Sequence, residues 1–208
     1  MMGKVFHNAV VSYGVGYLLC SLIHGSTGVC AQQFGPESAL SPLNATNLGP
    51  NFTVTAGTVD VVGPGFYDLC NAPESGNCVD LDGSTNQAGQ ISSKTLTLTP
   101  GTYTLSFDLI GSPLHDVTDS TTVTLGSLYD KTFVLGEGDV TDGIVNYTFT
   151  VSSPTTVQLV FTSNDGASNY GEILDNVDLV ATPEPATFSL MAIGLLGLLA
   201  LRRFAIAK

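Results

Sequence analysis

Alternation of apolar and polar side chains is the feature that most limits how this chain can fold. In residues 102–109, Thr-Tyr-Thr-Leu-Ser-Phe-Asp-Leu, every second side chain is apolar. Because successive side chains of a strand point to opposite faces of a sheet, this period of two predicts a strand with one face in a core and the other in water. Residues 145–151 and 157–161 repeat the pattern.

Further strand-like segments are separated by turn-forming residues. We expect them at residues 52–62, 79–81, 91–98, 121–125, 131–135 and 173–180. Dipeptides such as Pro100-Gly101 and Asp142-Gly143 lie between them and favour tight turns. Many short strands without a long helical pattern predict an all-β domain, a β-sandwich of the jelly-roll type.

The first 31 residues are typical of a secretory signal peptide. Lys4 precedes an apolar stretch at residues 10–23, and the small side chains of Val29 and Ala31 fit a cleavage site. We expect signal peptidase to remove residues 1–31, with an uncleaved anchor as the alternative. Residues 32–50 would form a lead-in segment and residues 51–181 the β-sandwich domain.

Residues 182–208 combine an extended start, an apolar run and a basic end. Proline disfavours helix in the residue before it, so Pro183-Glu184-Pro185 is expected to be extended. The charge-free run at 186–201 is 16 residues long, close to the roughly 17–25 that cross a bilayer. Arg202 and Arg203 would stay on the cytoplasmic side. A single transmembrane helix that anchors the protein transiently in the inner membrane is expected; a buried core helix is the alternative.

Pro183, Glu184 and Pro185, the apolar run, and Arg202 with Arg203 together resemble the PEP-CTERM sorting tail of Gram-negative bacteria. The resemblance implies that exosortase, a membrane-embedded cysteine protease, recognises this tail and removes or exchanges it. It further implies export to the cell envelope, outer surface or extracellular matrix, and an association with exopolysaccharide and biofilm.

The segment between the two terminal signals is strongly acidic. Residues 32–185 hold all 18 Asp and Glu residues and two basic ones, Lys94 and Lys131, so the formal charge of this segment is −16. Such a charge repels nucleic acid and anionic membrane, which argues against nucleic-acid partners. It suits divalent cations, basic partners or plain solubility.

Cys70 and Cys78 are the two cysteines that remain after the signal peptide. An even pair in an exported domain predicts a disulfide. A metal site built on these cysteines is disfavoured, because His115 is the only histidine left to complete it.

Four segments together, at residues 57–63, 79–83, 100–107 and 173–179, resemble the galactose-binding-like jelly rolls of bacterial surface proteins and plant cell-wall proteins. Relatives of that fold include many carbohydrate-binding modules. The resemblance implies binding to sugar or cell wall and no reaction. Extracellular polysaccharide is the partner expected from it.

Tyrosines beside loop segments are the candidates for contact with a sugar. Phe66, Tyr67 and Asp68 are the preferred set, because a disulfide at Cys70 would make their loop rigid. Tyr129 and Tyr170 lie in similar positions. An ordinary, partly buried tyrosine is the alternative at each position.

Asp175 shares strand parity with Val177 and Leu179, so its carboxylate is expected to point inward. A buried carboxylate needs hydrogen-bond donors or a cation. The two interpretations are hydrogen bonds to a neighbouring loop, or a structural Ca²⁺, for which Asp175 would be a ligand.

Catalysis has little support, and we expect no enzyme. Residues 32–185 contain one histidine, His115, and no Gly-x-Ser-x-Gly nucleophile elbow. The leading hypothesis is an exported, exosortase-sorted surface or matrix protein that binds glycan without catalysis. A purely structural acidic matrix protein is one alternative, and a glycan hydrolase that uses two carboxylates is another.

Overall fold

The computed structural model describes residues 43, 45, 48, 51–63, 69–70, 77–114, 117–139, 144–166 and 168–182. All regular structure in these residues is β, and none of them forms a helix that could cross a membrane. The expected signal peptide, most of the lead-in segment and residues 183–208 of the tail lie outside the described residues.

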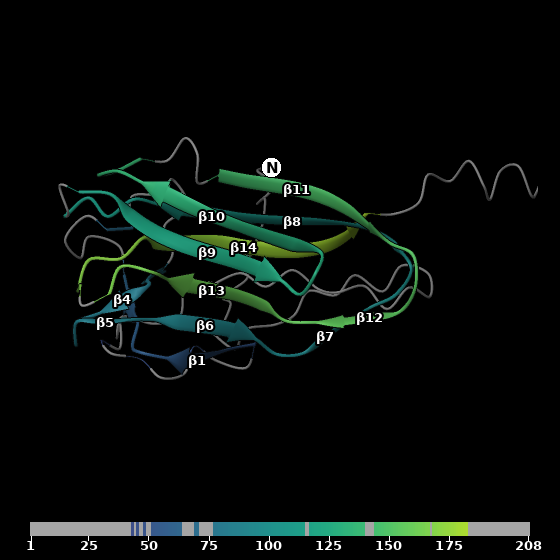
Figure 1. Ribbon diagram of the computed structural model, residues 1–208, viewed down its shortest axis with the longest axis horizontal. Coiled ribbons are helices and arrows are strands. Elements are labelled where there is room, and N and C mark those ends of the chain that lie inside the picture. The colour runs from purple at the N-terminus through teal and green to yellow at the C-terminus, as the bar shows by residue number, and fades with distance from the viewer. Residues whose placement is uncertain are drawn as a thin grey trace, which may run out of the picture.

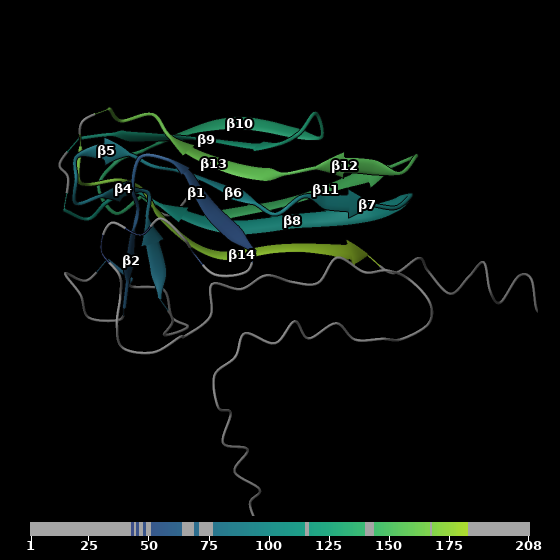
Figure 2. The same ribbon diagram turned by 90° about the horizontal axis from the view of Figure 1, so that it is seen from below.

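Two five-stranded antiparallel sheets face each other (Figures 1 and 2). One, called here the β9 sheet, has the order β1 (Phe52–Ala56), β6 (Gln90–Ser93), β13 (Leu159–Ser163), β9 (Asp119–Leu125) and β10 (Tyr129–Leu135). The other, the β8 sheet, has the order β11 (Ile144–Val151), β8 (Gly101–Ile110), β14 (Ile173–Thr182), β3 (Cys78–Asp80) and β2 (Asp60–Val62). This confirms the all-β jelly-roll sandwich.

Two short ribbons complete the domain. They are β7 (Leu96–Leu98) with β12 (Thr155–Val157), and β4 (Asp82–Gly83) with β5 (Gln87–Ala88). Figure 2 shows them at opposite ends of the sandwich. The expected strand at residues 52–62 is divided into β1 and β2, because Gly57 takes a φ of 58°. A Cβ at Gly57 would lie 2.0 Å from the Ala88 carbonyl oxygen, so only glycine fits there.

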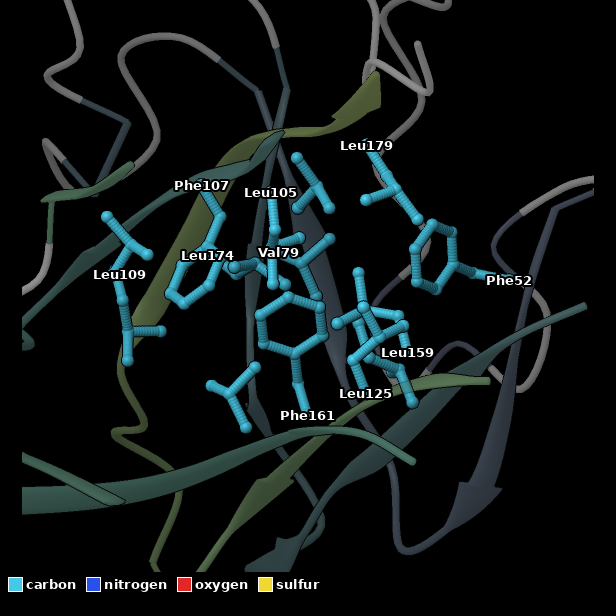
Figure 3. Packing of buried hydrophobic residues seen from close by; sticks show 14 of the residues in the cluster. Phe52, Val79, Leu105, Phe107, Leu109, Leu125, Leu159, Phe161, Leu174 and Leu179 are labelled. Carbon is cyan, nitrogen blue, oxygen red and sulfur yellow. The ribbon is translucent and has the colours of Figure 1, made fainter. Parts of the chain in front are cut away.

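The core forms where the inner faces of the two sheets meet. Burial alternates strictly along β8, as its sequence predicts, and Phe107 lies at the centre. The Phe107 ring packs edge-to-face on Phe161 of the opposite sheet at 5.2 Å between centroids, and on Phe133 at 5.8 Å. Figure 3 shows side chains from both sheets pointing toward one another. Interlocking aromatic rings of this kind fix how the sheets are stacked.

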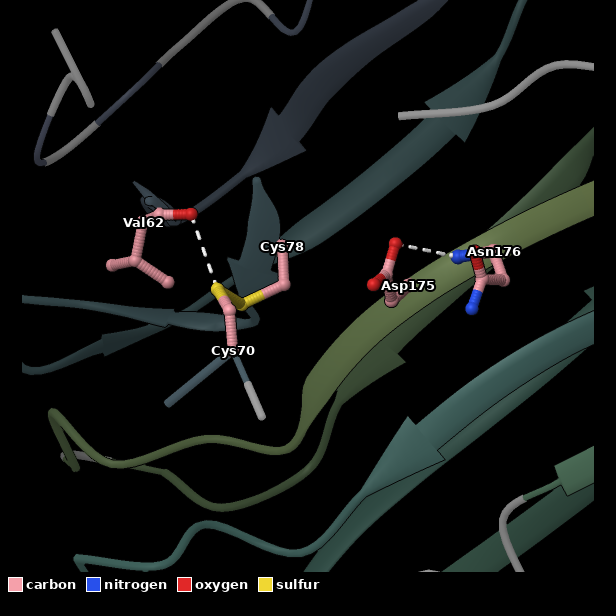
Figure 4. Close-up of a disulfide and its surroundings, with 5 residues drawn as sticks. All are labelled: Val62, Cys70, Cys78, Asp175 and Asn176. Carbon is pink, nitrogen blue, oxygen red and sulfur yellow. Dashed lines mark hydrogen bonds between the residues drawn. A yellow bond between two sulfur atoms is a disulfide. The ribbon is translucent and has the colours of Figure 1, made fainter. Parts of the chain in front are cut away.

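The disulfide between Cys70 and Cys78 is present, as expected (Figure 4). Cys78 belongs to a second, smaller apolar cluster with Val62, Leu69 and Ile173. The bridge therefore connects the segment after β2 to strand β3 and supports the apolar cluster beneath it.

Candidate functional site

The predicted site residues are not brought together in the described residues. Phe66, Tyr67 and Asp68 lie outside the residues that the structure describes. Tyr170 is exposed on the connection that leads into β14. Tyr129 lies at the start of β10, on the edge of the β9 sheet.

Asp175 does not follow the strand parity that its sequence suggests. The pairing of β14 with β8 shifts between Asp175 and Asp178, and Asn176 takes a φ of 52°. This bulge adds one residue to β14, so Leu174 joins Val177 in the main core. Asp175 instead lies on the outer face of the β8 sheet; the expectation that it faces the core with Val177 is corrected.

The Asp175 carboxylate is nevertheless buried, at 5% exposure. It accepts a hydrogen bond from the Asn176 backbone N–H at 2.7 Å (Figure 4). Its partner across the strands is Asp108, which accepts a 2.6 Å bond from the Asn176 side chain. Burial raises the pKa of Asp175, the Asn176 N–H opposes this, and the Asp108 charge adds to it.

The structural Ca²⁺ expected at Asp175 stays a prediction. In the part of the chain that the structure describes, no three Asp, Glu, His or Cys side chains are placed to hold a metal. A calcium site normally collects six to eight oxygen ligands, several of them carboxylates. The one hydrogen bond described for the Asp175 carboxylate comes from Asn176 within β14 itself and not from a neighbouring loop.

A cleft of about 530 Å³ opens at the edge of the sandwich, between β10 of one sheet and β11 of the other. Its lining consists of Ser127, Leu128, Tyr129, Asp130, Lys131, Val145, Asn146 and Tyr147. Because β10 and β11 are both outermost strands, nothing from either sheet continues past them on this side.

Two tyrosine rings form the aromatic part of this cleft. Tyr129 and Tyr147 lie 4.9 Å apart between centroids with their planes tilted by 54°. Tyr147 stacks in turn on Phe149 at 5.8 Å, and Tyr129 packs edge-on against Phe107 at 6.5 Å. Tyr147 keeps 38% of its surface exposed, so the pair is anchored in the core on one side and open on the other.

Polar groups surround the tyrosine pair. The Lys131 ammonium lies 4.2 Å from the centre of the Phe133 ring, which holds the cation along the strand. Asp130 and Asn146 add a carboxylate and an amide to the lining. Burial, followed by the proximity of Tyr147, raises the pKa of Tyr129. An aromatic surface with donors and acceptors at its rim can bind a sugar ring.

The sequence pattern indicates one of the two tyrosines in this cleft. Tyr129 is a candidate because it lies beside a loop, whereas the alternation in residues 145–151 predicts only that Tyr147 points inward from a strand. The two residues belong to different sheets, and their meeting depends on how the sheets stack. The alternation in residues 145–151 does not show that β11 is an edge strand, and without that information the contact between Tyr147 and Tyr129 cannot be predicted.

Buried carboxylates gather at one end of the sandwich, where β8 ends and β14 begins. This acidic end contains Asp60, Asp80, Asp82, Asp119, Asp165 and Glu172, of which all but the half-buried Asp165 are at most 6% exposed. Neither described lysine lies there, since Lys94 donates to Asn51 and Lys131 lies over Phe133.

Backbone amides and hydroxyls solvate these carboxylates. Asp80 accepts 3.0 Å bonds from the N–H groups of Asp82 and Gly171, and Thr121 donates to Glu172 at 2.7 Å. The second oxygen of Glu172 is buried without a hydrogen bond. Burial raises the pKa of Glu172, the Thr121 bond opposes this, and the Asp165 charge adds to the rise, which gives a pKa of about 8. Burial likewise raises the pKa of Asp165 to about 6 and that of Asp80 well above its usual range.

Solved structures of two carbohydrate-binding modules and of one glycosidase are similar to this chain at low identity. The CBM61 module TmCBM61, solved in complex with β-1,4-galactotriose, has 14% identity and a TM-score of 0.42, covering 66% of this chain and 92% of that one. The C-terminal CBM6 of LamC from Zobellia galactanivorans has 15% identity and a TM-score of 0.37, covering 61% and 90%. An MgGH51 α-L-arabinofuranosidase has 8% identity and a TM-score of 0.46, covering 71% and 25%.

A comparison with curated protein sequences gave no match. Residues 181–203, by contrast, match the family described as the PEP-CTERM protein-sorting motif. The match includes Pro183, Glu184, Pro185, Arg202 and Arg203, which the sequence had singled out. The chain therefore carries a PEP-CTERM sorting motif and is an exported, surface-sorted protein with an all-β jelly-roll domain.

Proposed function

We propose that this protein is processed by exosortase and binds extracellular glycan, without catalysis, in the cleft between β10 and β11. The observation that carries the proposal is the open Tyr129–Tyr147 pair with Lys131, Asp130 and Asn146 around it. Rings of this kind offer a flat apolar surface to the C–H face of a sugar, while the polar groups bind its hydroxyls. Retention in an exopolysaccharide or biofilm matrix would follow from such binding.

The composition of the cleft supports binding over hydrolysis. Glycoside hydrolysis by the common mechanisms needs two carboxyl groups that flank the scissile bond. Asp130 is the only carboxylate among the residues that line the cleft. The buried carboxylates of the acidic end do not line the cleft and are enclosed in protein.

Binding is tested with a glycan array, followed by calorimetry on the glycans retained. We expect Tyr129→Ala and Tyr147→Ala each to weaken binding about tenfold, which corresponds to about 1.4 kcal/mol. Tyr170→Ala is the matched control, since Tyr170 has almost the same exposure, 37% against 38% for Tyr147, and does not line the cleft. Equal losses in all three variants, or no retained glycan, would contradict the proposal and favour a purely structural matrix protein.

Processing is tested separately at the sorting motif. Arg202→Glu combined with Arg203→Glu should impair removal of the tail, because the basic residues that hold the cytoplasmic end of the apolar run are then lost. Mass spectrometry of the surface protein measures the outcome. Mature protein that still contains residues 186–208 would rule out cleavage within the motif.

A further inference from the structure

The sorting motif begins inside the folded sheet. Its first two residues, Ala181 and Thr182, are the last two of β14 and pair with Tyr103 and Thr102 of β8. The domain and the motif therefore have no separate linker between them.

The chain that follows is short. Residues 183–187 separate Thr182 from Phe188, the first large apolar residue of the tail. Six steps of fully extended chain reach about 20 Å at most. The ten-residue strand β8 is itself about 30 Å long. With the apolar run in a membrane, the end of the sandwich that holds Thr182 is thus the end kept near the lipid.

The described turns and strand ends around Thr182 carry no charge. Thr102 lies there between Thr150 of β11 and Thr182 of β14. No Asp, Glu, Lys or Arg occurs in residues 95–107, 144–164 or 179–182, which supply this end and the strands behind it. Figure 2 shows β7, β12 and the end of β14 together at this end, and β4 and β5 at the other.

Three other orientations of the domain would bring carboxylates to the lipid. The opposite end is the acidic end, to which the exposed Glu137 also belongs. The outer face of the β8 sheet carries Asp108 and Asp178, and the β9 sheet carries Asp130 on its edge strand. Anionic phospholipid repels such groups within a Debye length of about 8 Å.

We propose that the uncharged end of the sandwich, made of the turns at residues 99–101 and 152–154 together with Thr182, faces the anionic phospholipid surface while the tail is inserted. This inference rests on the membrane-inserted stage of the proposed function and is independent of glycan binding. The serine and threonine hydroxyls of this end can approach phosphate headgroups, whereas the acidic end stands away from them. The domain thereby leaves the start of the sorting motif at the membrane, where a membrane-embedded protease can reach it.

Fluorescence quenching in vesicles tests the orientation. The full chain, with Cys20 and Cys30 replaced by serine and its disulfide left intact, receives one label at either Ser153→Cys or Thr118→Cys. Both positions are exposed; Ser153 follows β11 at the uncharged end, and Thr118 precedes β9 at the acidic end. The vesicles contain phosphatidylcholine, phosphatidylglycerol and a headgroup-nitroxide lipid.

We expect at least about threefold stronger quenching at position 153, because position 118 stands roughly a strand length of 30 Å farther from the lipid. Equal quenching, or stronger quenching at position 118, would overturn the inference. Flotation with unlabelled vesicles checks whether the chain inserts. If the chain does not float with the vesicles, the membrane-inserted stage is wrong and this inference is wrong with it. The glycan-binding test is independent of that outcome.

Added charge gives a second readout. Ser152→Asp with Ser153→Asp should slow tail removal several-fold, since the two carboxylates are brought against the anionic surface. Val117→Asp with Thr118→Asp adds the same charge at exposed positions of the acidic end and should leave removal unchanged. Equal rates for the two double variants would also contradict the inference.

Discussion

One end of the sandwich is acidic and the other is uncharged, although the same strands run through both. β14 begins at the acidic end beside Glu172 and finishes at Thr182, and the described residues of strands β7, β8, β11 and β12 that surround Thr182 carry no charge. At the acidic end, polar groups are buried and hold connections together; at the uncharged end, hydroxyls face outward next to the sorting motif. A formal charge of −16 over the segment therefore describes neither end well.

The largest expected effect comes from the core between the two ends. Phe107→Ala should lower the free energy of unfolding by about 3–5 kcal/mol, because it removes a fully enclosed ring that contacts both sheets. Phe107→Leu keeps most of the volume and should cost less. Urea unfolding followed by circular dichroism and tyrosine fluorescence measures both variants. Different midpoints from the two probes would show that the ends unfold separately, which would break the view of one cooperative sandwich.

The acidic end should make the domain less stable as pH rises. Glu172 has a pKa of about 8 in the folded protein against 4.5 ordinarily, so the folded state binds its proton more tightly than the unfolded state does. Its contribution is complete below about pH 4.5 and is lost progressively up to about pH 8. Asp165, with a pKa of about 6, adds a similar loss at lower pH.

Glu172→Gln should therefore stabilise the domain at pH 8 by about 2–4 kcal/mol, since a tenfold change in proton affinity is worth about 1.4 kcal/mol. Glutamine keeps an oxygen that can accept the Thr121 bond. Thermal unfolding from pH 5 to pH 8 gives the slope, and the exposed Glu137→Gln is the matched control. A variant with the same pH slope as the parent would show that Glu172 is not the titrating group.

Loss of the disulfide should have a somewhat smaller effect. Cys70→Ser with Cys78→Ser should lower the free energy of unfolding by about 2–3 kcal/mol, the entropy expected for closing so short a loop. Urea midpoints with matched slopes measure it. Two reactive thiols in the denatured, unreduced parent protein would show that the bridge is not formed in the exported protein.

The smallest effect is expected at the uncharged end. Ser153→Asp should change the free energy of unfolding by less than about 0.5 kcal/mol, because Ser153 is exposed in a turn. Thermal unfolding at neutral pH is sufficient to measure it. A larger loss would mean that this end depends on being uncharged for folding, and effects of the same substitution on tail removal could then not be assigned to the membrane.

Local patterns in the sequence are sufficient to predict one central strand, the disulfide and the sorting motif. The alternation at residues 102–109 predicted β8 and its buried face, the Cys70–Cys78 pair predicted the bridge, and Pro183 to Arg203 predicted the sorting motif. Each of these depends on residues close together in the sequence, so spacing alone is enough to recognise it.

Tertiary structure alone decided the rest, because it depends on contacts between distant segments. The bulge at Asn176 reversed the expected direction of Asp175, and it exists only in the pairing of β14 with β8. Tyr129 and Tyr147 meet because two edge strands of different sheets lie side by side. Glu172 acquires its pKa of about 8 only because folding encloses it among other carboxylates, away from both described lysines. Strand pairing and sheet stacking set these distances, and a one-residue shift in pairing is enough to move a side chain from one face of a sheet to the other.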